Sequence, residues 1–165
     1  LAFANSHGVL QTNVTPDTVF VEDDGRVLLT HWTYVILTDA FPEFALCDQY
    51  QNQLLYAHGV VGFTPAYVAP EIVNHDIARV TERTLVYQCG AILFSILTGK
   101  PPHTGKNAMN CAQNAAKNII VPVEQSGELM SIAQRALQTH PEDRFSTVQD
   151  FQAAVEGHGN NDASH

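Results

Sequence analysis

A chain of 165 residues in which 45% are hydrophobic is long enough for one domain with an ordinary core. Eight Lys and Arg residues against 17 Asp and Glu residues give a net charge of −9, which argues against a surface for nucleic acid or for an anionic membrane. Three widely spaced cysteines, and no apolar run that could span a bilayer, indicate a cytoplasmic protein with reduced thiols and no membrane contact through this segment.

The first third of the chain predicts a short helix and a β-hairpin. Residues 1–7 are typical of the last turns of a helix, and Gly8 can take the left-handed conformation that ends one. The runs Val19–Val21 and Val27–Leu29 flank an acidic Asp-Gly turn, which is the pattern of a hairpin with a solvated tip. Residues 31–62 show no regular period, and such a long irregular segment is usually functional or mobile.

The segment from Thr84 to Gly99 is apolar on nearly every side of a helix. A helix without a polar face lies inside protein or membrane, and its length of about 20 Å is too short to cross a bilayer. Gly99 and the two prolines after Lys100 end it. We therefore predict a buried central helix against which the other elements pack.

Three more helices are predicted downstream. The first covers residues 108–117, the second is capped by Ser126, and the third is capped by Ser146. Residues 157–165 are rich in Gly, Asn and Ser, and we expect them to form a disordered tail. The predicted fold class is α+β and mostly α-helical, with a small β-hairpin and a buried central helix.

Four stretches, in this order, resemble the C-terminal lobe (C-lobe) of eukaryotic-like Ser/Thr protein kinases. His7-Gly8-Val9-Leu10-Gln11-Thr12-Asn13-Val14-Thr15-Pro16-Asp17-Thr18-Val19 resembles the catalytic loop, H-G-V-I-H-R-D-L-K-P-E-N-V. The other three are the TPAYVAPE run at 64–71, the central helix with its exit at 86–102, and the turn PEDRF at 141–145. The resemblance implies a kinase-like C-lobe over residues 1–156, with the N-terminal lobe (N-lobe) upstream of Leu1 and absent from this chain.

The same resemblance implies that the residues of phosphoryl transfer are replaced. The general base Asp corresponds to Asn13 and the phosphoryl-steadying Lys to Thr15, while the Mg²⁺-binding Asn and Asp correspond to Thr18 and His31. An amide cannot accept the substrate proton, and an imidazole brings no negative charge to a hard Mg²⁺ ion. We therefore expect no intact catalytic, cofactor or metal site and no bound cofactor, although active members of the family use ATP and Mg²⁺.

The same resemblance implies that some other kinase residues are replaced and that others are retained. The Arg that would pair with an activation-loop phosphate corresponds to Thr12, and the Asp that would brace the catalytic loop from the central helix corresponds to Leu85. The resemblance implies that Glu71 and Arg144 form a buried ion pair and that Trp32 acts as an aromatic plug. These three positions are structural in either an active or an inactive kinase.

Two more functional interpretations carry less weight than a simple structural one. His31 could be a metal ligand or a pH switch, but no second ligand is placed near it by the sequence, which favours a neutral substitution. Thr38, Tyr50 and Tyr56 could be phosphorylated, but Thr12 offers no guanidinium group to pair with the phosphate. We expect neither a zinc site nor a phosphate-ordered switch of the usual kind.

The favoured interpretation is a pseudokinase C-lobe: not an enzyme, but a module that binds proteins in signalling, such as an active kinase or its substrate. By resemblance, we expect the partner surface around Thr64, Pro65 and Tyr67 and along residues 108–117. One alternative is a divergent Ser/Thr kinase that transfers phosphate from ATP when its N-lobe is present. Another is a decayed fragment without function, which predicts exposed apolar surface around Leu1, Val19 and Val27.

Overall fold

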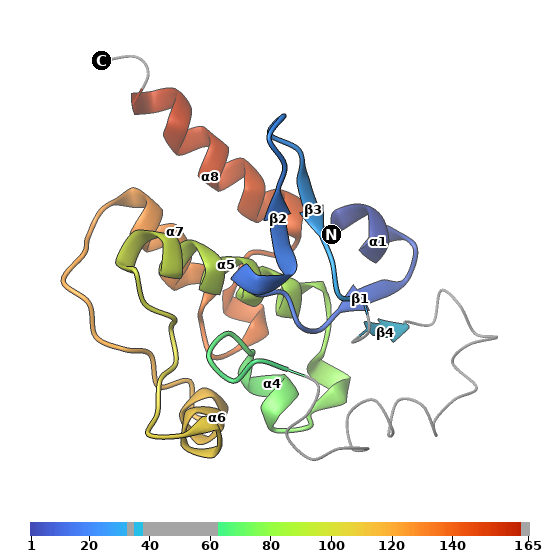
Figure 1. Cartoon of the computed structure of the whole chain (residues 1–165), viewed down its shortest axis with the longest axis vertical. Helices are drawn as coiled ribbons and strands as arrows, with labels where there is room; N and C mark the ends of the chain where they lie inside the picture. The colour runs from blue at the N-terminus through green and yellow to red at the C-terminus, as the bar shows by residue number, and fades with distance from the viewer. Residues whose placement is uncertain (33–34, 38–62, 163–165) are drawn as a thin grey trace.

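The computed structural model describes residues 1–32, 35–37 and 63–162 (Figure 1). Thr38, Tyr50 and Tyr56, which are possible phosphorylation sites, lie outside the described residues, as does most of the segment predicted to be irregular. The described chain is mostly helical with two small antiparallel sheets, so the predicted α+β class is confirmed.

The N-terminal part holds all the described strands. It comprises, in order, α1 (Ala2–Ser6), β1 (Val9–Gln11), η1 (Pro16–Thr18), β2 (Val19–Val21), β3 (Val27–Leu29) and β4 (Val35–Leu37). Strands β2 and β3 pair with the register Val19↔Leu29, and Gly25 takes a left-handed φ of 83° in the turn between them. The predicted hairpin is therefore confirmed. Strand β1 pairs with β4, which brings His31 close to the end of β1.

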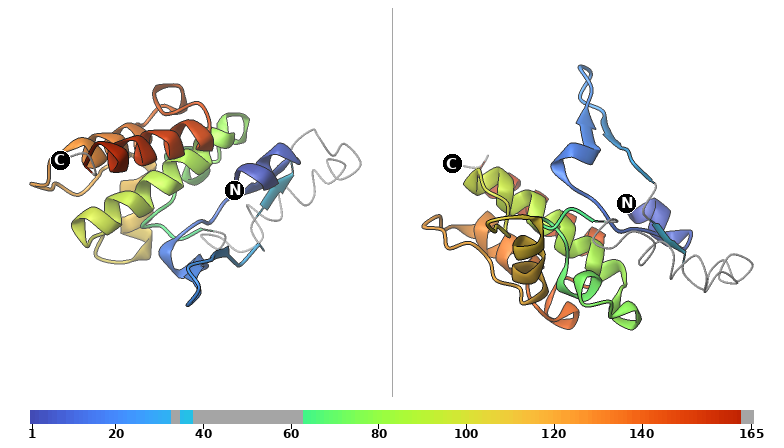
Figure 2. Two further views of the ribbon diagram at one scale, coloured as in Figure 1. Left: turned by 90° about the horizontal axis from the view of Figure 1, so that it is seen from above. Right: turned by 60° about the horizontal axis from the view of Figure 1, so that its bottom comes forward.

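Helix α5 (Glu82–Thr98) is the central element of the C-terminal part. Thr81 caps its start by accepting a hydrogen bond from the backbone N–H of Arg83, and Gly99 ends it in the left-handed conformation with φ 69°. It packs against α7 (Glu128–Ala136) and α8 (Val148–Asp162). Figure 2 shows these three helices together on one side of the molecule, with α1 and the hairpin on the other.

Shorter elements complete the C-terminal part: α4 (Pro70–Val73), η2 (Ile77–Arg79), α6 (Ala108–Ala116) and η3 (Pro141–Asp143). The largest cluster of buried apolar residues lies between α5 and α7 and consists of Ala69, Tyr87, Ala91, Phe94, Met130, Ala133 and Leu137. This cluster fixes the position of α5, to which the segment at Thr12 is hydrogen-bonded through Gln88. Within the described residues, no helix is both long and apolar enough to cross a membrane.

The structure corrects several details of the sequence prediction. Helix α5 is buried only on part of its surface, because Ile96 near its end is 74% exposed. Gly127, not Ser126, stands at the N-cap of α7. At the start of α8, the hydroxyl of Thr147 accepts the N–H of Asp150, while the Ser146 hydroxyl instead accepts a hydrogen bond from Arg83.

The C-terminal end also differs from the expected disordered tail. Helix α8 continues to Asp162, so residues 157–162 are helical. In the part of the chain that the structure describes, no atom lies within 4 Å of the position that a Cβ of residue 157 would take, so no close packing there accounts for Gly157. The apolar residues of α8 that precede Gly157 pack against the core. The helix that they begin continues through residues 157–162, whose composition predicts a coil.

Candidate functional site

The segment that resembles a catalytic loop runs from β1 into η1 and is held by its own buried side chains. Gln11 at the end of β1 is fully buried, and its amide Nε2 donates a 2.9 Å hydrogen bond to the carbonyl oxygen of His31. Its Oε1 accepts the backbone N–H of Asn13 at 3.4 Å. Gln11 therefore links the backbone of the loop at Asn13 to the backbone of His31, which follows strand β3.

Asn13 ties this loop to the segment that begins at Thr64. The Oδ1 atom of Asn13 accepts the backbone N–H of Thr64 at 2.9 Å, across 51 positions of the chain. The amide oxygen is thus occupied by a structural hydrogen bond. The sequence alone does not reveal this contact, because no periodic pattern connects the two segments.

Thr15 and Thr18 are buried and bind to each other. The hydroxyl of Thr18 accepts the N–H of Thr15 at 3.0 Å and donates to the carbonyl oxygen of Thr15 at 2.9 Å. These bonds close the single turn of η1 in the manner of a capping box. Both residues have a structural role in the loop.

His31 and Trp32 lie on the exposed side of the site. His31 takes a left-handed φ of 58°, and its Nδ1 lies 2.9 Å from the hydroxyl oxygen of the neighbouring Thr30. Trp32 donates its indole N–H to the carbonyl oxygen of Leu29 and is 42% exposed. The ring that the resemblance identifies as an aromatic plug is thus partly open to solvent.

Gln88 is the residue of this site that the sequence analysis missed. It lies buried on α5, one turn after Leu85, and its Nε2 donates a 2.5 Å hydrogen bond to the carbonyl oxygen of Thr12. This contact braces the catalytic-loop segment from the central helix, at a position next to the one where the family has its Asp. A polar residue inside an otherwise apolar helix is the signal that could have identified it.

The Oε1 atom of Gln88 has no hydrogen-bond partner within the described part of the chain. Only one end of the buried amide is therefore satisfied, and the unpaired oxygen offsets part of the stabilisation that the bond to Thr12 provides.

Glu71 and Arg144 form the buried ion pair that the resemblance implies. Two parallel bonds of 2.7 and 2.9 Å join the guanidinium to the carboxylate, and the Thr84 hydroxyl donates to the same carboxylate at 2.8 Å. Arg144 also donates to the carbonyl oxygens of Arg83, Gln138 and Thr139. Because its charge and its N–H groups are satisfied, the pair fixes α4, α5 and η3 together.

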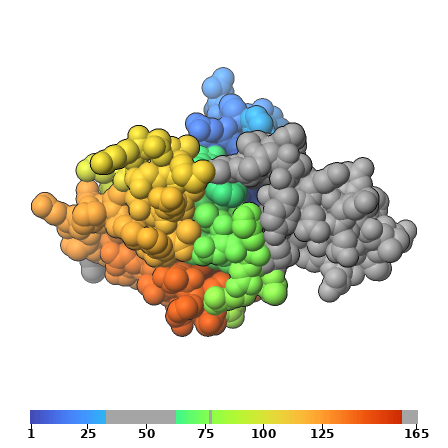
Figure 3. All heavy atoms as spheres, turned by 90° about the horizontal axis from the view of Figure 1, so that it is seen from below, coloured from blue at the N-terminus to red at the C-terminus, as the bar shows by residue number. Residues whose placement is uncertain are grey.

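The expected partner surface is partly exposed. Thr64, Pro65 and Tyr67 are half-buried, and the Tyr67 hydroxyl lies 3.2 Å from the hydroxyl of Ser95 on α5. Helix α6 packs against α4 and buries Cys111, whereas Met109 near its start is 56% exposed. Figure 3 shows α6 (yellow) and the region around α4 (green) side by side on one face.

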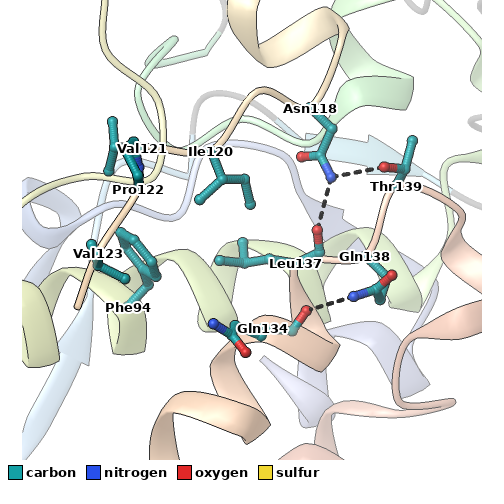
Figure 4. A pocket seen from close by; sticks show the side chains of 10 residues that line it. All are labelled: Phe94, Asn118, Ile120, Val121, Pro122, Val123, Gln134, Leu137, Gln138 and Thr139. Carbon is teal, nitrogen blue, oxygen red and sulfur yellow. Dashed lines mark hydrogen bonds between the residues drawn. The ribbon is translucent and has the colours of Figure 1, made fainter. Parts of the chain in front are cut away.

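A cavity of about 450 Å³ lies between α5, the end of α7 and the connection that follows α6 (Figure 4). Its wall combines apolar and uncharged polar side chains, namely Phe94, Asn118, Ile120, Val121, Pro122, Val123, Gln134, Leu137, Gln138 and Thr139. Sequence reasoning did not find it, because its wall is formed by three segments that are distant along the chain.

The amino-acid sequence of this chain is also similar to known proteins. A family model described as the protein kinase domain matches residues 6–155. Serine/threonine-protein kinase PknD of Chlamydia muridarum is 27% identical over 172 residues, which cover 94% of this chain and 18% of that protein.

Two further relatives have similar names. Serine/threonine-protein kinase PknB of Mycobacterium tuberculosis is 27% identical over 158 residues, which cover 93% of this chain and 23% of that protein. CBL-interacting serine/threonine-protein kinase 12 of Arabidopsis thaliana is 28% identical over 150 residues, which cover 88% and 28% of the two chains. This chain therefore spans 18 to 28% of the length of these relatives.

Proposed function

The chain belongs to the protein kinase family, and we propose that it is a catalytically inactive member that binds protein partners in cytoplasmic signalling. In this proposal residues 1–156 act as a kinase-like C-lobe that serves as a pseudokinase module. Its partners are proteins such as an active kinase or the substrate of one.

One observation carries the proposal. Residues at the positions where the family has catalytic groups are engaged in contacts within the chain. Asn13 accepts the N–H of Thr64, Thr18 closes a turn on Thr15, and His31 lies beside the hydroxyl of Thr30. None of these side chains is a carboxylate, so none brings the negative charge that a general base or a Mg²⁺ ligand supplies.

The donor set at these positions does not fit Mg²⁺. A hard cation prefers carboxylate and carbonyl oxygens, and an amide, a hydroxyl and an imidazole offer it no negative charge. Within the described residues, no group of three or more His, Cys, Asp or Glu side chains could hold a metal ion. In this proposal the chain therefore carries out no phosphoryl transfer through Mg²⁺ and ATP.

The size of the expected losses in reaction rate favours an inactive chain over a weakly active one. A general base and the electrostatic stabilisation of the transition state each contribute on the order of 10²–10⁴-fold to rates at comparable sites. Losing the base and both metal-binding groups together should reduce phosphoryl transfer to near the uncatalysed rate. Binding is the function that remains open to such a fold, and the face at Thr64–Tyr67 and α6 is our proposed partner surface.

A second candidate is a divergent Ser/Thr kinase. It is favoured by the relatives, which are named serine/threonine-protein kinases. In that case the chain would transfer phosphate from ATP to protein Ser or Thr with altered metal chemistry when an N-lobe is present.

A third candidate is a decayed fragment without function. It is favoured by the apolar hairpin, where Val27 is 65% exposed, although Leu1 and Val19 are half-buried. A soluble, monodisperse chain with one cooperative unfolding transition would contradict decay.

Radiolabelled phosphate transfer separates the first two candidates. The assay uses the natural protein, with any sequence that precedes Leu1, together with Mg²⁺ or Mn²⁺ and a Ser/Thr-containing substrate protein. We expect no incorporation above background. Turnover that is lost in an Asn13→Ala variant and rises sharply in an Asn13→Asp/His31→Asp double variant would establish the divergent kinase instead.

A further inference from the structure

Three polar side chains form a chain of hydrogen bonds beside the cavity. His103 and Tyr87 are fully buried, and Asn118 lies at the start of the connection after α6. The Tyr87 hydroxyl oxygen is 2.6 Å from His103 Nε2 and 2.6 Å from Asn118 Oδ1. On the other side of the imidazole, Nδ1 lies 2.9 Å from the carbonyl oxygen of Ile119.

The orientation of the Asn118 amide is fixed by its other contacts. Its Nδ2 donates to the carbonyl oxygen of Leu137 at 2.9 Å and lies 3.0 Å from the Thr139 hydroxyl (Figure 4). A flipped amide would place its oxygen against the Leu137 carbonyl oxygen, so that two acceptors would face each other. Oδ1 therefore faces Tyr87 and can only accept a hydrogen bond.

The number of protons does not match the number of contacts when His103 is neutral. Three contacts run in series, from Ile119 through His103 and Tyr87 to Asn118, and each needs one proton. A neutral imidazole and the Tyr87 hydroxyl supply one proton each. One of the three contacts is then left without a proton. Two acceptor atoms face each other there, either between Tyr87 and Asn118 or at one ring nitrogen of His103.

A second proton on His103 removes this conflict. The imidazolium donates from Nδ1 to Ile119 and from Nε2 to the Tyr87 oxygen, and the Tyr87 hydroxyl is then committed to Asn118. When His103 is neutral with its proton on Nδ1, the Tyr87 hydroxyl can turn to Nε2, and its hydrogen bond to Asn118 is lost. The atoms and charges balance, because only one proton is taken up from water or returned to it.

We propose that Tyr87, His103 and Asn118 form a proton-operated latch that fastens the connection after α6 onto α5. Uptake of a proton by His103 closes the latch on Asn118, and loss of the proton releases it. Asn118 begins the segment 118–123 that walls the cavity, so the latch controls how firmly this wall is held.

The groups around the latch define its electrostatics. From α5, Tyr87 is the titratable neighbour, and burial raises its pKa, so its hydroxyl keeps its proton. Arg144 stacks on the Tyr87 ring at 4.7 Å from the centroid, and its charge is balanced by Glu71. The segment before α5 contributes the carbonyl of Ala66, which accepts the backbone N–H of His103.

Two further titratable side chains lie on the segment before α5 and on α6. The Tyr67 hydroxyl contacts Ser95, and burial raises the pKa of the Cys111 thiol on α6. Among the described residues, the ring nitrogens of His103 contact the Ile119 carbonyl and the Tyr87 hydroxyl, so neither ring contact is to a carboxylate.

Burial shifts the pH range in which His103 takes up its proton. It lowers the pKa of His103 from 6.5, and the hydrogen bond to Ile119 raises it in part. The unfolded chain therefore binds this proton more readily than the folded chain. The contribution of neutral His103 to stability is complete above pH 6.5 and is lost as the pH falls below that value towards the folded pKa.

The test is a histidine titration of the 165-residue chain by long-range ¹H–¹⁵N correlation NMR, from pH 8 down to the onset of unfolding. We expect neutral His103 to carry its proton on Nδ1. As it becomes doubly protonated, the side-chain amide of Asn118 should shift with the same midpoint. A neutral Nε2–H form, or an Asn118 amide that does not respond, would overturn the latch.

Asn118→Gly supplies the decisive variant. Glycine suits the left-handed backbone of this position, where φ is 51°, so the variant removes Oδ1 without backbone strain. Tyr87 can then donate permanently to Nε2, and we expect His103 to titrate at lower pH than in the native chain. The matched control is Asn74→Ala, which removes another side-chain bond to a carbonyl, that of Ala116, and should leave the midpoint unchanged. Equal midpoints in native and Asn118→Gly chains would contradict the proposal.

Discussion

Helix α5 and the β2–β3 hairpin are both apolar in sequence, yet they differ in what surrounds them. The residues of α5 that face α7 are buried, and the Glu71–Arg144 pair fixes its first turns to α4 and η3. The hairpin instead leaves apolar side chains on its surface, namely Phe20, Val21, Val27 and Leu28. The comparison teaches that the packing which stabilises this molecule lies mainly in its helical part, whereas the β2–β3 hairpin carries an apolar surface without contributing comparable packing.

The largest effect in this comparison is expected from the buried ion pair. Arg144→Ala leaves the Glu71 carboxylate buried without its partner and should destabilise the chain by about 3–5 kcal/mol. Urea-induced unfolding would measure this loss. The control is Arg79→Ala, which removes an exposed pair with Glu142 and should leave the midpoint nearly unchanged. Equal losses in the two variants would show that the buried pair does not hold the helical part together.

The next effect concerns the contact between α5 and α7. A Cβ added at Gly90 would overlap with the Cβ of Ala136, so Gly90→Ala should force the two helices apart and cost about 1–3 kcal/mol. Gly157→Ala is the matched control, because no described atom lies within 4 Å of a Cβ at that position in α8 and alanine favours a helix. Thermal unfolding should therefore shift down for the first variant and slightly up for the second. A Gly90→Ala chain as stable as the native one would mean that the two helices pack less closely.

A smaller effect is expected at the hydrogen bond through which Gln88 on α5 holds the catalytic-loop segment. Gln88→Met removes the hydrogen bond to the Thr12 carbonyl and also the unpaired Oε1, so the two effects partly offset each other. We expect a net loss of about 1 kcal/mol and faster amide hydrogen exchange in residues 12–15 than in α5. Leu93, which is half-buried on the same helix, is the control site: Leu93→Met should not accelerate exchange in the loop. If amide hydrogen exchange in residues 12–15 is unchanged in Gln88→Met, then Gln88 does not hold this segment in place.

The smallest effect is expected in the hairpin. Val27→Thr lies on the exposed surface and should change the free energy of unfolding by no more than about 0.5 kcal/mol. Phe94→Ala in the buried cluster of α5 provides the contrast, with an expected loss of about 3–5 kcal/mol. Chemical denaturation of both variants would measure the difference. A large loss for Val27→Thr would show that the hairpin contributes to the core.

The sequence predicts elements whose information is local. The Asp-Gly turn between β2 and β3, the apolar run of α5 and the left-handed Gly99 at its end are all encoded within a few residues. The misplaced caps show the limit of this approach: Gly127 takes the N-cap of α7 beside Ser126, and Thr147 bonds the start of α8 beside Ser146.

Contacts between distant segments could not be predicted in this way. Gln88 reaches Thr12 across 76 positions, and Asn13 reaches Thr64 across 51, and neither spacing follows a helical or strand period. The Tyr87–His103–Asn118 network likewise depends on how α5 meets the connection after α6. The resemblance to kinases identifies which positions have changed, whereas the contacts of the new side chains depend on how distant segments meet in the fold.

The most direct test of the central claim, that the packing of a kinase fold persists while its catalytic positions hold the chain together, is thermal unfolding of the natural protein with and without ATP. Mg²⁺, Mn²⁺ and EDTA are compared at each nucleotide concentration. A ligand present at 100 times its Kd should stabilise the folded state by about 2.7 kcal/mol, which shifts the midpoint by several degrees. We predict one cooperative transition that no nucleotide or metal shifts. A midpoint raised by ATP only with Mg²⁺ or Mn²⁺ would show that a working nucleotide site remains, and would contradict the claim.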